Sequence, residues 1–177
     1  MSEPPGDWEL LDERPVHEGW ISVTERQYRL PDGRVVAWEV DNSADAVAVL
    51  ALTDDDQAVV VDQFRPGPGR RMRSLPAGII DRGESAEQAA HRELREETGF
   101  TARRLDVVAT AVRGSSTQRM YAAVALGCRR TAAQQLEPTE DISVHLVGIA
   151  ELRAAVRAGE LIAPHMVYLA LDHAGLL

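Results

Sequence analysis

The sequence of 177 residues contains a single cysteine and no long apolar run. That cysteine, Cys128, cannot build an intrachain disulfide framework or a multi-cysteine zinc site, and it fits a reducing cytoplasmic location. The longest apolar run, residues 46–52, is far too short to cross a bilayer. Residues 1–12 lack the basic start and the apolar stretch of a secretory signal. We therefore expect a cytoplasmic protein with no membrane partner.

Basic charge is also scarce. The chain has 19 Lys and Arg residues against 28 Asp and Glu residues, which gives a net charge of −9. This field repels phosphate backbones, so we expect no nucleic-acid partner. A small phosphate-bearing ligand would need a local cation or an arginine cluster to reverse the sign at one site. The G-x-S-x-G, Walker and Rossmann glycine patterns are absent as well.

The length suits one compact domain with a small appendage, since domains usually hold about 100 to 200 residues. Residues 1–42 are expected to form an N-terminal lead and a small antiparallel sheet with a role in dimerisation. Residues 43–177 are expected to form the main domain. Within these parts, residues 1–15 should be poorly ordered, and the Pro- and Gly-rich residues 64–74 should be a loop.

Alternating apolar residues and turn signals predict strands around one well-defined helix. The predicted strands are 20–23, 27–30, 35–40, 46–53, 57–63, 105–112, 119–126 and 142–147, and the predicted helices are 85–98, 151–158 and 164–173. The first helix has explicit ends, because Ser85 and Gln88 form a capping box and Gly99 suits a left-handed C-cap. This order is typical of an α/β (α+β) protein with a mixed sheet covered by helices.

Three glutamates on the predicted helix 85–98 form the candidate chemical site. Glu93, Glu96 and Glu97 fall within one arc of about 100° on a helix. At a separation of roughly 6 Å and an effective dielectric constant of 20, each pair repels by about 3 kcal/mol, so an occluded trio needs a counter-charge. Oxygen ligands favour Mg²⁺ or Mn²⁺ over zinc. The alternative is a solvated helix face on which Arg92 and Arg95 relieve the repulsion.

The residues around the trio follow a recognisable pattern. From Gly78 to Phe100 the chain satisfies G-x5-E-x7-R-E-U-x-E-E-x-G-U at every position, where U is a bulky aliphatic or aromatic residue. This is the Nudix box, and the chain resembles the Nudix hydrolases. The resemblance implies an α/β/α sandwich and carboxylates that hold Mg²⁺ or Mn²⁺ against the diphosphate of a nucleotide.

The resemblance also implies a role for each matching residue. Four residues are implied metal ligands, the first through its backbone carbonyl: Ala77, Glu93, Glu96 and Glu97. Arg92 is counted with Glu93 and Glu97 in the catalytic set, and it pairs with Glu84 to brace the loop. Gly78 and Gly99 are implied to be required for the backbone conformation of the motif. Gly78 is also implied to bind the substrate.

Sequences outside the box resemble the ADP-ribose pyrophosphatase branch of the family. The segments are Gln63-Phe64-Arg65-Pro66 and Leu75-Pro76-Ala77-Gly78, and they imply a substrate contact for Arg65. Further arginines near the box could form an anion-binding rim: Arg70, Arg71, Arg73 and Arg82. For Arg70 and Arg71 a solvated basic loop is equally open.

The acidic loop at residues 137–141 resembles the catalytic loop of that branch, in which a glutamate activates or positions the attacking water. We assign this role to Glu140, with Glu137 as the alternative. A solvated acidic loop remains the third possibility, because loop glutamates are usually exposed.

Residues 16–40 resemble the small sheet that this branch exchanges between the subunits of a homodimer. Tyr28 or Trp20 could stack on the base of the partner's substrate, or could pack within the sheet. One departure concerns residues 112–116, which lack a proline that members preferring ADP-ribose usually carry. The polar residues 115–119 could hold a sugar or phosphate instead, or could form a plain turn.

The expected activity is metal-dependent hydrolysis of ADP-ribose or a related nucleoside diphosphate sugar, a small-molecule substrate, to AMP and ribose 5-phosphate. The alternative within enzymes is a different substrate, such as another nucleotide sugar, a dinucleotide or an oxidised nucleoside triphosphate. The alternative outside enzymes is a Nudix module that senses nucleotide sugars without turnover. The intact set of glutamates argues against a sensor.

Overall fold

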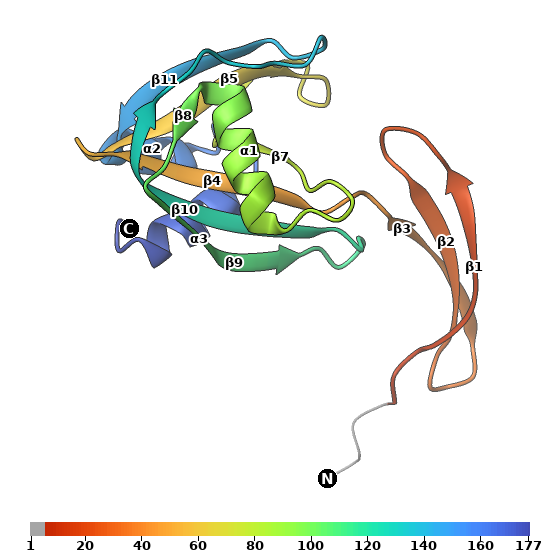
Figure 1. Cartoon of the computed structure of the whole chain (residues 1–177). Coiled ribbons are helices and arrows are strands. Elements are labelled where there is room, and N and C mark those ends of the chain that lie inside the picture. The colour runs from red at the N-terminus through yellow and green to blue at the C-terminus, as the bar shows by residue number, and fades with distance from the viewer. Residues whose placement is uncertain (1–5) are drawn as a thin grey trace. The chain divides into compact units, whose positions relative to one another are not determined.

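The computed structural model describes residues 6–177 and divides the chain into two compact units (Figure 1). The first unit comprises the chain up to Ala44 together with Val112–Arg119. The second comprises Asp45–Ala111 and Met120–Leu177. Within residues 6–177, no helix is long and apolar enough to cross a membrane.

The first unit is a three-stranded antiparallel sheet in the order β1-β2-β3. Its strands are β1 (Glu9–His17), β2 (Val23–Arg29) and β3 (Val35–Asp41). The turn between β2 and β3 falls at residues 31–34, where Gly33 has φ 86°. A single strand, β2, replaces the two strands predicted at 20–23 and 27–30.

The presence of β1 corrects the prediction that residues 1–15 are poorly ordered, of which residues 1–5 lie outside the described part. Every residue of β1 is exposed, so the strand lacks the apolar alternation on which a prediction depends. Ion pairs to β2 stabilise it instead: Glu9 with Arg29 at 2.5 Å, Arg14 with Glu25 at 2.9 Å, and Glu13 with Arg26.

The second unit is built on an eight-stranded mixed sheet with the order β11-β5-β4-β10-β8. Three short or peripheral strands join this path: β6 pairs with β5, β7 with β4, and β9 with β10. The strands are β4 (Ala46–Thr53), β5 (Gln57–Arg65), β6 (Arg70–Ser74), β7 (Ala77–Ile79), β8 (Phe100–Thr101), β9 (Arg104–Val112), β10 (Arg119–Arg130) and β11 (Ile142–Gly148). The central pair, β4 and β10, is parallel.

Residues 64–74 correct a second prediction, because most of them are strand and not loop. β5 continues to Arg65, and β6 pairs back onto it with Phe64 opposite Arg71. The Pro- and Gly-rich residues form only the connection, where Gly69 has φ 66° and donates its N–H to Arg65 O at 3.0 Å. The turn signal was therefore correct, but it covered a shorter segment than predicted.

Helices cover both faces of this sheet (Figure 1). They are α1 (Ala86–Thr98) on one face, and α2 (Ile149–Ala158) and α3 (Pro164–His173) on the other. β4 alternates between the two cores: Val47 and Val49 pack with α1, whereas Ala48 and Leu50 pack with α2 and α3. Six consecutive residues of β4 are buried for this reason. The α/β/α sandwich with a mixed sheet is confirmed.

Candidate active site

The ends of α1 fix the position of the glutamates. Gln88 donates its backbone N–H to Ser85 Oγ at 3.2 Å, and Ser85 donates its N–H to Gln88 Oε1 at 2.8 Å, which confirms the predicted capping box. Gly99 ends the helix with φ 75°. A Cβ at Gly99 would lie 2.2 Å from Ala132 O, so both the backbone conformation and the close approach require glycine.

Glu93 and Glu97 are buried, with exposed fractions of 8% and 3%. Ala77 donates its backbone N–H to Glu97 Oε2 at 2.9 Å. Burial raises the pKa of Glu97 to about 8, and the charges of Glu93 and Glu140 add to the rise. Burial also raises the pKa of Glu93, with contributions from the charges of Glu96 and Glu140. Glu93 and Glu97 are therefore not on a solvated face, and neighbouring carboxylates act on both of them.

Arg92 connects the helix to the loop that precedes it. Its Nε and Nη2 donate to the two carboxylate oxygens of Glu84 at 3.0 and 2.8 Å, and Nη2 also donates to Ile79 O at 2.8 Å. Its Nη1 donates to Glu93 Oε1 at 2.6 Å and to Glu96 Oε2 at 3.4 Å. These bonds raise the pKa of Arg92 and lower that of Glu84. Arg92 thus lies between the loop and the carboxylates.

Gly78 lies against Glu93. It is the central residue of β7, and it pairs with Val47 of β4. A Cβ at this position would lie 2.0 Å from Glu93 Oε1 and 2.1 Å from its Cδ. Glycine is therefore required here by the close approach of a carboxylate, with no need for a positive φ.

Arg65, at the end of β5, lies close enough to the cluster that its charge opposes the pKa rise of Glu97. Its Nε is buried and has no hydrogen-bond acceptor within the described residues. An unpaired buried donor costs about 1 to 3 kcal/mol, so the guanidinium can gain from an anionic ligand.

Glu140 and Glu137 occupy different positions in the acidic loop. The charge of Glu140 contributes to the raised pKa of both Glu93 and Glu97, and its side chain is half-buried. Glu137 is exposed and donates its backbone N–H to Glu140 Oε2 at 2.8 Å. The charge of Glu140 therefore acts on Glu93 and Glu97, and the backbone of Glu137 holds its carboxylate.

Two arginines of the predicted rim, Arg71 and Arg73, form ion pairs with acidic residues. Arg73 pairs with Glu151 at 2.8 Å and with Asp62 at 3.3 Å. Arg71 pairs with Asp141 at 2.5 Å, so it is a partner of the acidic loop, although its side chain is exposed. Gln134 was missed by sequence reasoning; it donates to the backbone of Glu97, and no local pattern marks it.

The first unit holds the aromatic candidates. Tyr28 packs edge to face on Trp8 at 5.9 Å between ring centroids, and both line a pocket with Trp38. Trp20 is 93% exposed and is not among the residues that line this pocket. The polar turn supports β3: Ser116 Oγ donates to Asp41 O at 3.1 Å.

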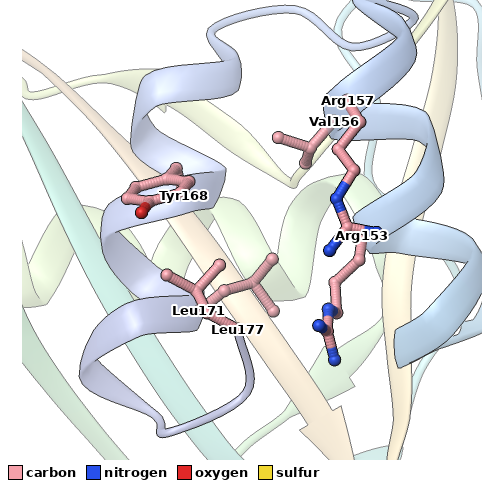
Figure 2. Close-up of a pocket in the computed structure, with 6 residues that line it drawn as sticks. All are labelled: Arg153, Val156, Arg157, Tyr168, Leu171 and Leu177. Atoms are coloured by element: carbon pink, nitrogen blue, oxygen red, sulfur yellow. The ribbon is translucent and has the colours of Figure 1, made fainter.

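A separate cavity lies between α2 and α3 (Figure 2). Arg153, Val156 and Arg157 of α2 face Tyr168 and Leu171 of α3, and Leu177 closes the apolar floor. None of the residues assigned to the active site lines it.

The donor set at the cluster fits a divalent cation with a preference for oxygen ligands. Glu93, Glu96, Glu97 and Glu140 supply only carboxylate oxygens, and the burial of two of them makes a positive counter-charge favourable. Within residues 6–177, no three such side chains are already gathered as a metal cage. All four carboxylates accept hydrogen bonds from the protein itself: Glu93 and Glu96 from Arg92, Glu97 from the backbone of Ala77, and Glu140 from the backbone of Glu137.

Comparison with known proteins agrees with this geometry. The NUDIX domain model matches residues 42–165. An ADP-ribose pyrophosphatase of Mycobacterium tuberculosis (strain ATCC 25618 / H37Rv) is 34% identical over 161 residues, which cover 88% of this chain and 78% of that protein. The chain therefore belongs to the Nudix hydrolase family, as the box predicted.

Two further relatives show how far the similarity extends. An ADP-ribose pyrophosphatase of Bacillus subtilis (strain 168) is 45% identical over 85 residues, 48% of this chain and 46% of that protein. The crystal structure of an ADP compounds hydrolase has a TM-score of 0.81 at 21% identity, and the match covers 99% of this chain and 100% of that one. At this identity the structural likeness shows the fold alone.

Proposed function

We propose that this protein hydrolyses the diphosphate bond of ADP-ribose or a related nucleoside diphosphate sugar in the cytoplasm, giving AMP and ribose 5-phosphate. The observation that carries the proposal is the buried glutamate cluster, in which Glu97 has a pKa of about 8. Such a site favours a divalent cation, through which an acidic protein can hold a diphosphate. The two ADP-ribose pyrophosphatases described above support the substrate class.

The residues that would hold Mg²⁺ or Mn²⁺ are the carbonyl of Ala77 and the carboxylates of Glu93, Glu96 and Glu97. When bound, the metal neutralises phosphate oxygens and lowers the pKa of water near phosphorus. In this proposal Glu140 accepts or orients the proton of that water. Arg65, whose Nε has no acceptor within the described residues, binds a phosphate oxygen. Arg92 holds the loop and Glu93 in position.

The working unit in this proposal is a homodimer. The three-stranded sheet exposes large apolar side chains, namely Leu10, Leu11, Val16, Trp20, Ile21, Val35 and Trp38. Such a surface is typical of an interface. A partner subunit would bring Tyr28 or Trp20 to the base of the substrate.

The decisive assay incubates the protein with nucleotide sugars, dinucleotides and nucleoside triphosphates, with Mg²⁺ and with Mn²⁺, and identifies products by mass. Release of AMP and ribose 5-phosphate from ADP-ribose supports the proposal. Release of inorganic pyrophosphate from a triphosphate would assign another substrate, and tight binding without turnover would assign a sensor.

Glu97→Gln tests the metal role, with Glu87→Gln as its matched control. Glu87 lies on the same helix and is exposed. Loss of one charged metal ligand should reduce kcat more than tenfold, because several kcal/mol of charge stabilisation is lost. A Glu97→Gln variant that keeps more than about a tenth of the wild-type kcat would contradict the role.

A further inference from the structure

The C-terminal end of α1 is capped by the segment that leads into the acidic loop. A helix leaves its last carbonyls without intrahelical partners. Gln135 donates its backbone N–H to Glu96 O at 2.8 Å, and Gln134 donates Nε2 to Glu97 O at 2.7 Å. Thr131 donates its N–H to Gly99 O at 2.9 Å. The helix that carries the metal glutamates is thus fastened to the start of the loop that carries Glu140.

The amide of Gln134 also fastens the end of that loop. The same Nε2 donates to the carbonyl of Ile142, the first residue of β11, at 3.1 Å. One side chain therefore joins the end of α1 to the residues before and after residues 135–141. A displacement of either end would break one of the two bonds.

Arg71 holds the loop at Asp141. Its Nη1 donates to Asp141 Oδ2 at 2.5 Å, and its Nη2 donates to Asp141 O at 3.1 Å and to Asp62 O at 2.9 Å. Asp141 directly follows Glu140, and Asp62 lies on β5 in the sheet. The guanidinium fork fixes the backbone next to Glu140 in a way that a single ion pair would not.

We infer that Gln134 and Arg71 are positioning residues that place the Glu140 carboxylate at the glutamate cluster. This inference rests on the proposed function, in which Glu140 handles the proton of the attacking water. Between the two fastened points, the loop is closed by Glu140 N–H to Glu137 O at 3.0 Å and by Glu137 N–H to Glu140 Oε2 at 2.8 Å. The position of the carboxylate therefore depends on both side chains.

If Arg71 only stabilised the fold, its loss would lower Tm together with kcat. The Arg71 and Asp141 side chains are 42% and 79% exposed, and exposed ion pairs contribute little to stability. Loss of Arg71 should therefore change kcat much more than it changes Tm. For loss of either Arg71 or Gln134, KM should stay within about twofold of the wild-type value, because in this inference neither side chain contacts the substrate.

The test is a double-mutant cycle with ADP-ribose and saturating Mg²⁺. The variants are Gln134→Met, Arg71→Met and Glu140→Gln, with each of the first two made alone and in combination with Glu140→Gln. Gln135→Met is the matched control for Gln134→Met. Gln135 is the next residue and is exposed, and the substitution leaves its backbone N–H bond to Glu96 O in place. Arg129→Met is the control for the second, because Arg129 is an exposed strand arginine paired with Asp54 at 2.8 Å.

We expect Gln134→Met and Arg71→Met each to lower kcat about tenfold, the equivalent of one hydrogen bond. In the Glu140→Gln background, both should have less than about a twofold effect. Equal losses with and without Glu140, or wild-type kcat in both single variants, would overturn the inference. A normal kcat in Glu140→Gln would instead overturn the proposed role of Glu140, and the inference with it.

Hydrogen exchange at the Glu137 N–H gives a readout that does not depend on activity. This amide donates a hydrogen bond to the Glu140 carboxylate, so we expect it to exchange slowly. Its exchange should accelerate more than about tenfold in Gln134→Met and Arg71→Met, and it should be unchanged in the two controls. Unchanged exchange in both Gln134→Met and Arg71→Met would overturn the inference even if no substrate were turned over.

Discussion

Burial of Glu97 makes the stability of the metal-free protein depend on pH. The folded-state pKa is about 8, against an ordinary value of 4.5. Since the folded pKa is raised, the folded state binds the proton more tightly than the unfolded state does. The contribution to stability is complete below about pH 4.5 and is lost as the pH rises towards 8. A pKa difference of about 3.5 corresponds to about 5 kcal/mol, and Glu93 acts in the same direction.

Glu97→Gln removes this dependence, because glutamine has the shape of the protonated acid and does not ionise. At pH 8.5 without metal, we expect the variant to be more stable than the wild type by several kcal/mol, although it loses activity. At pH 5 the two should differ by less than about 1 kcal/mol. Urea unfolding in EDTA between pH 5 and 8.5 measures both quantities, with Glu87→Gln as the control.

Divalent metal should oppose the loss of wild-type stability with rising pH, since metal binding requires the deprotonated carboxylate of Glu97. The stabilisation by Mg²⁺ should increase from pH 6 to pH 8, and titration calorimetry in buffers of different ionisation enthalpy should show proton release on binding. A metal-free wild-type stability that is flat from pH 5 to 8.5 would contradict the raised pKa of Glu97. A Glu97→Gln variant that loses stability with rising pH as steeply as the wild type would show that other groups cause the dependence.

Three further predictions concern single positions. Gly78→Ala should reduce Mg²⁺ affinity measured by calorimetry more than tenfold with a small change in Tm, because its Cβ displaces the Glu93 carboxylate; an unchanged affinity would contradict this. Gly99→Ala should lower the free energy of unfolding by about 1 to 3 kcal/mol in urea, since alanine would have to adopt the positive φ of this position and its Cβ would clash with Ala132 O; an unchanged free energy of unfolding would contradict this. Cys128 should resist iodoacetamide at pH 8 until the protein unfolds, because burial raises the pKa of its thiol to about 11; mass spectrometry of the folded protein would show any labelling that contradicts this.

Sequence reasoning succeeded where the determinants are local. The caps of α1 and the spacing of Glu93, Glu96 and Glu97 depend on residues within a few positions of one another, so the amino-acid pattern alone places the helix and its carboxylates. The short apolar run at residues 46–52 likewise predicted a strand, which is β4. In contrast, β1 has no buried face, and its cross-strand ion pairs with β2 cannot be read from its own residues.

The contacts that reach across the sequence could not be predicted in the same way. Arg71 and Asp141 are 70 positions apart, and nothing in the local pattern distinguishes Arg71 from the neighbouring Arg70. Gln134 is 37 positions from Glu97, and its role arises only because the chain returns to the end of α1. Those two residues follow from tertiary structure, whereas the box follows from sequence.

The same burial that destabilises the metal-free state also determines what can bind there. Glu93 and Glu97 are withdrawn from water, so a cation at the cluster replaces both the lost hydration and the proton retained by Glu97. The free energy stored in the unbound state is then recovered on binding, which couples metal affinity to folding stability. With a cation bound, this site would add to Arg65 the positive charge that a chain of net charge −9 needs in order to hold a diphosphate. It follows that substitutions which make the metal-free protein more stable at this cluster should also make it bind metal less well.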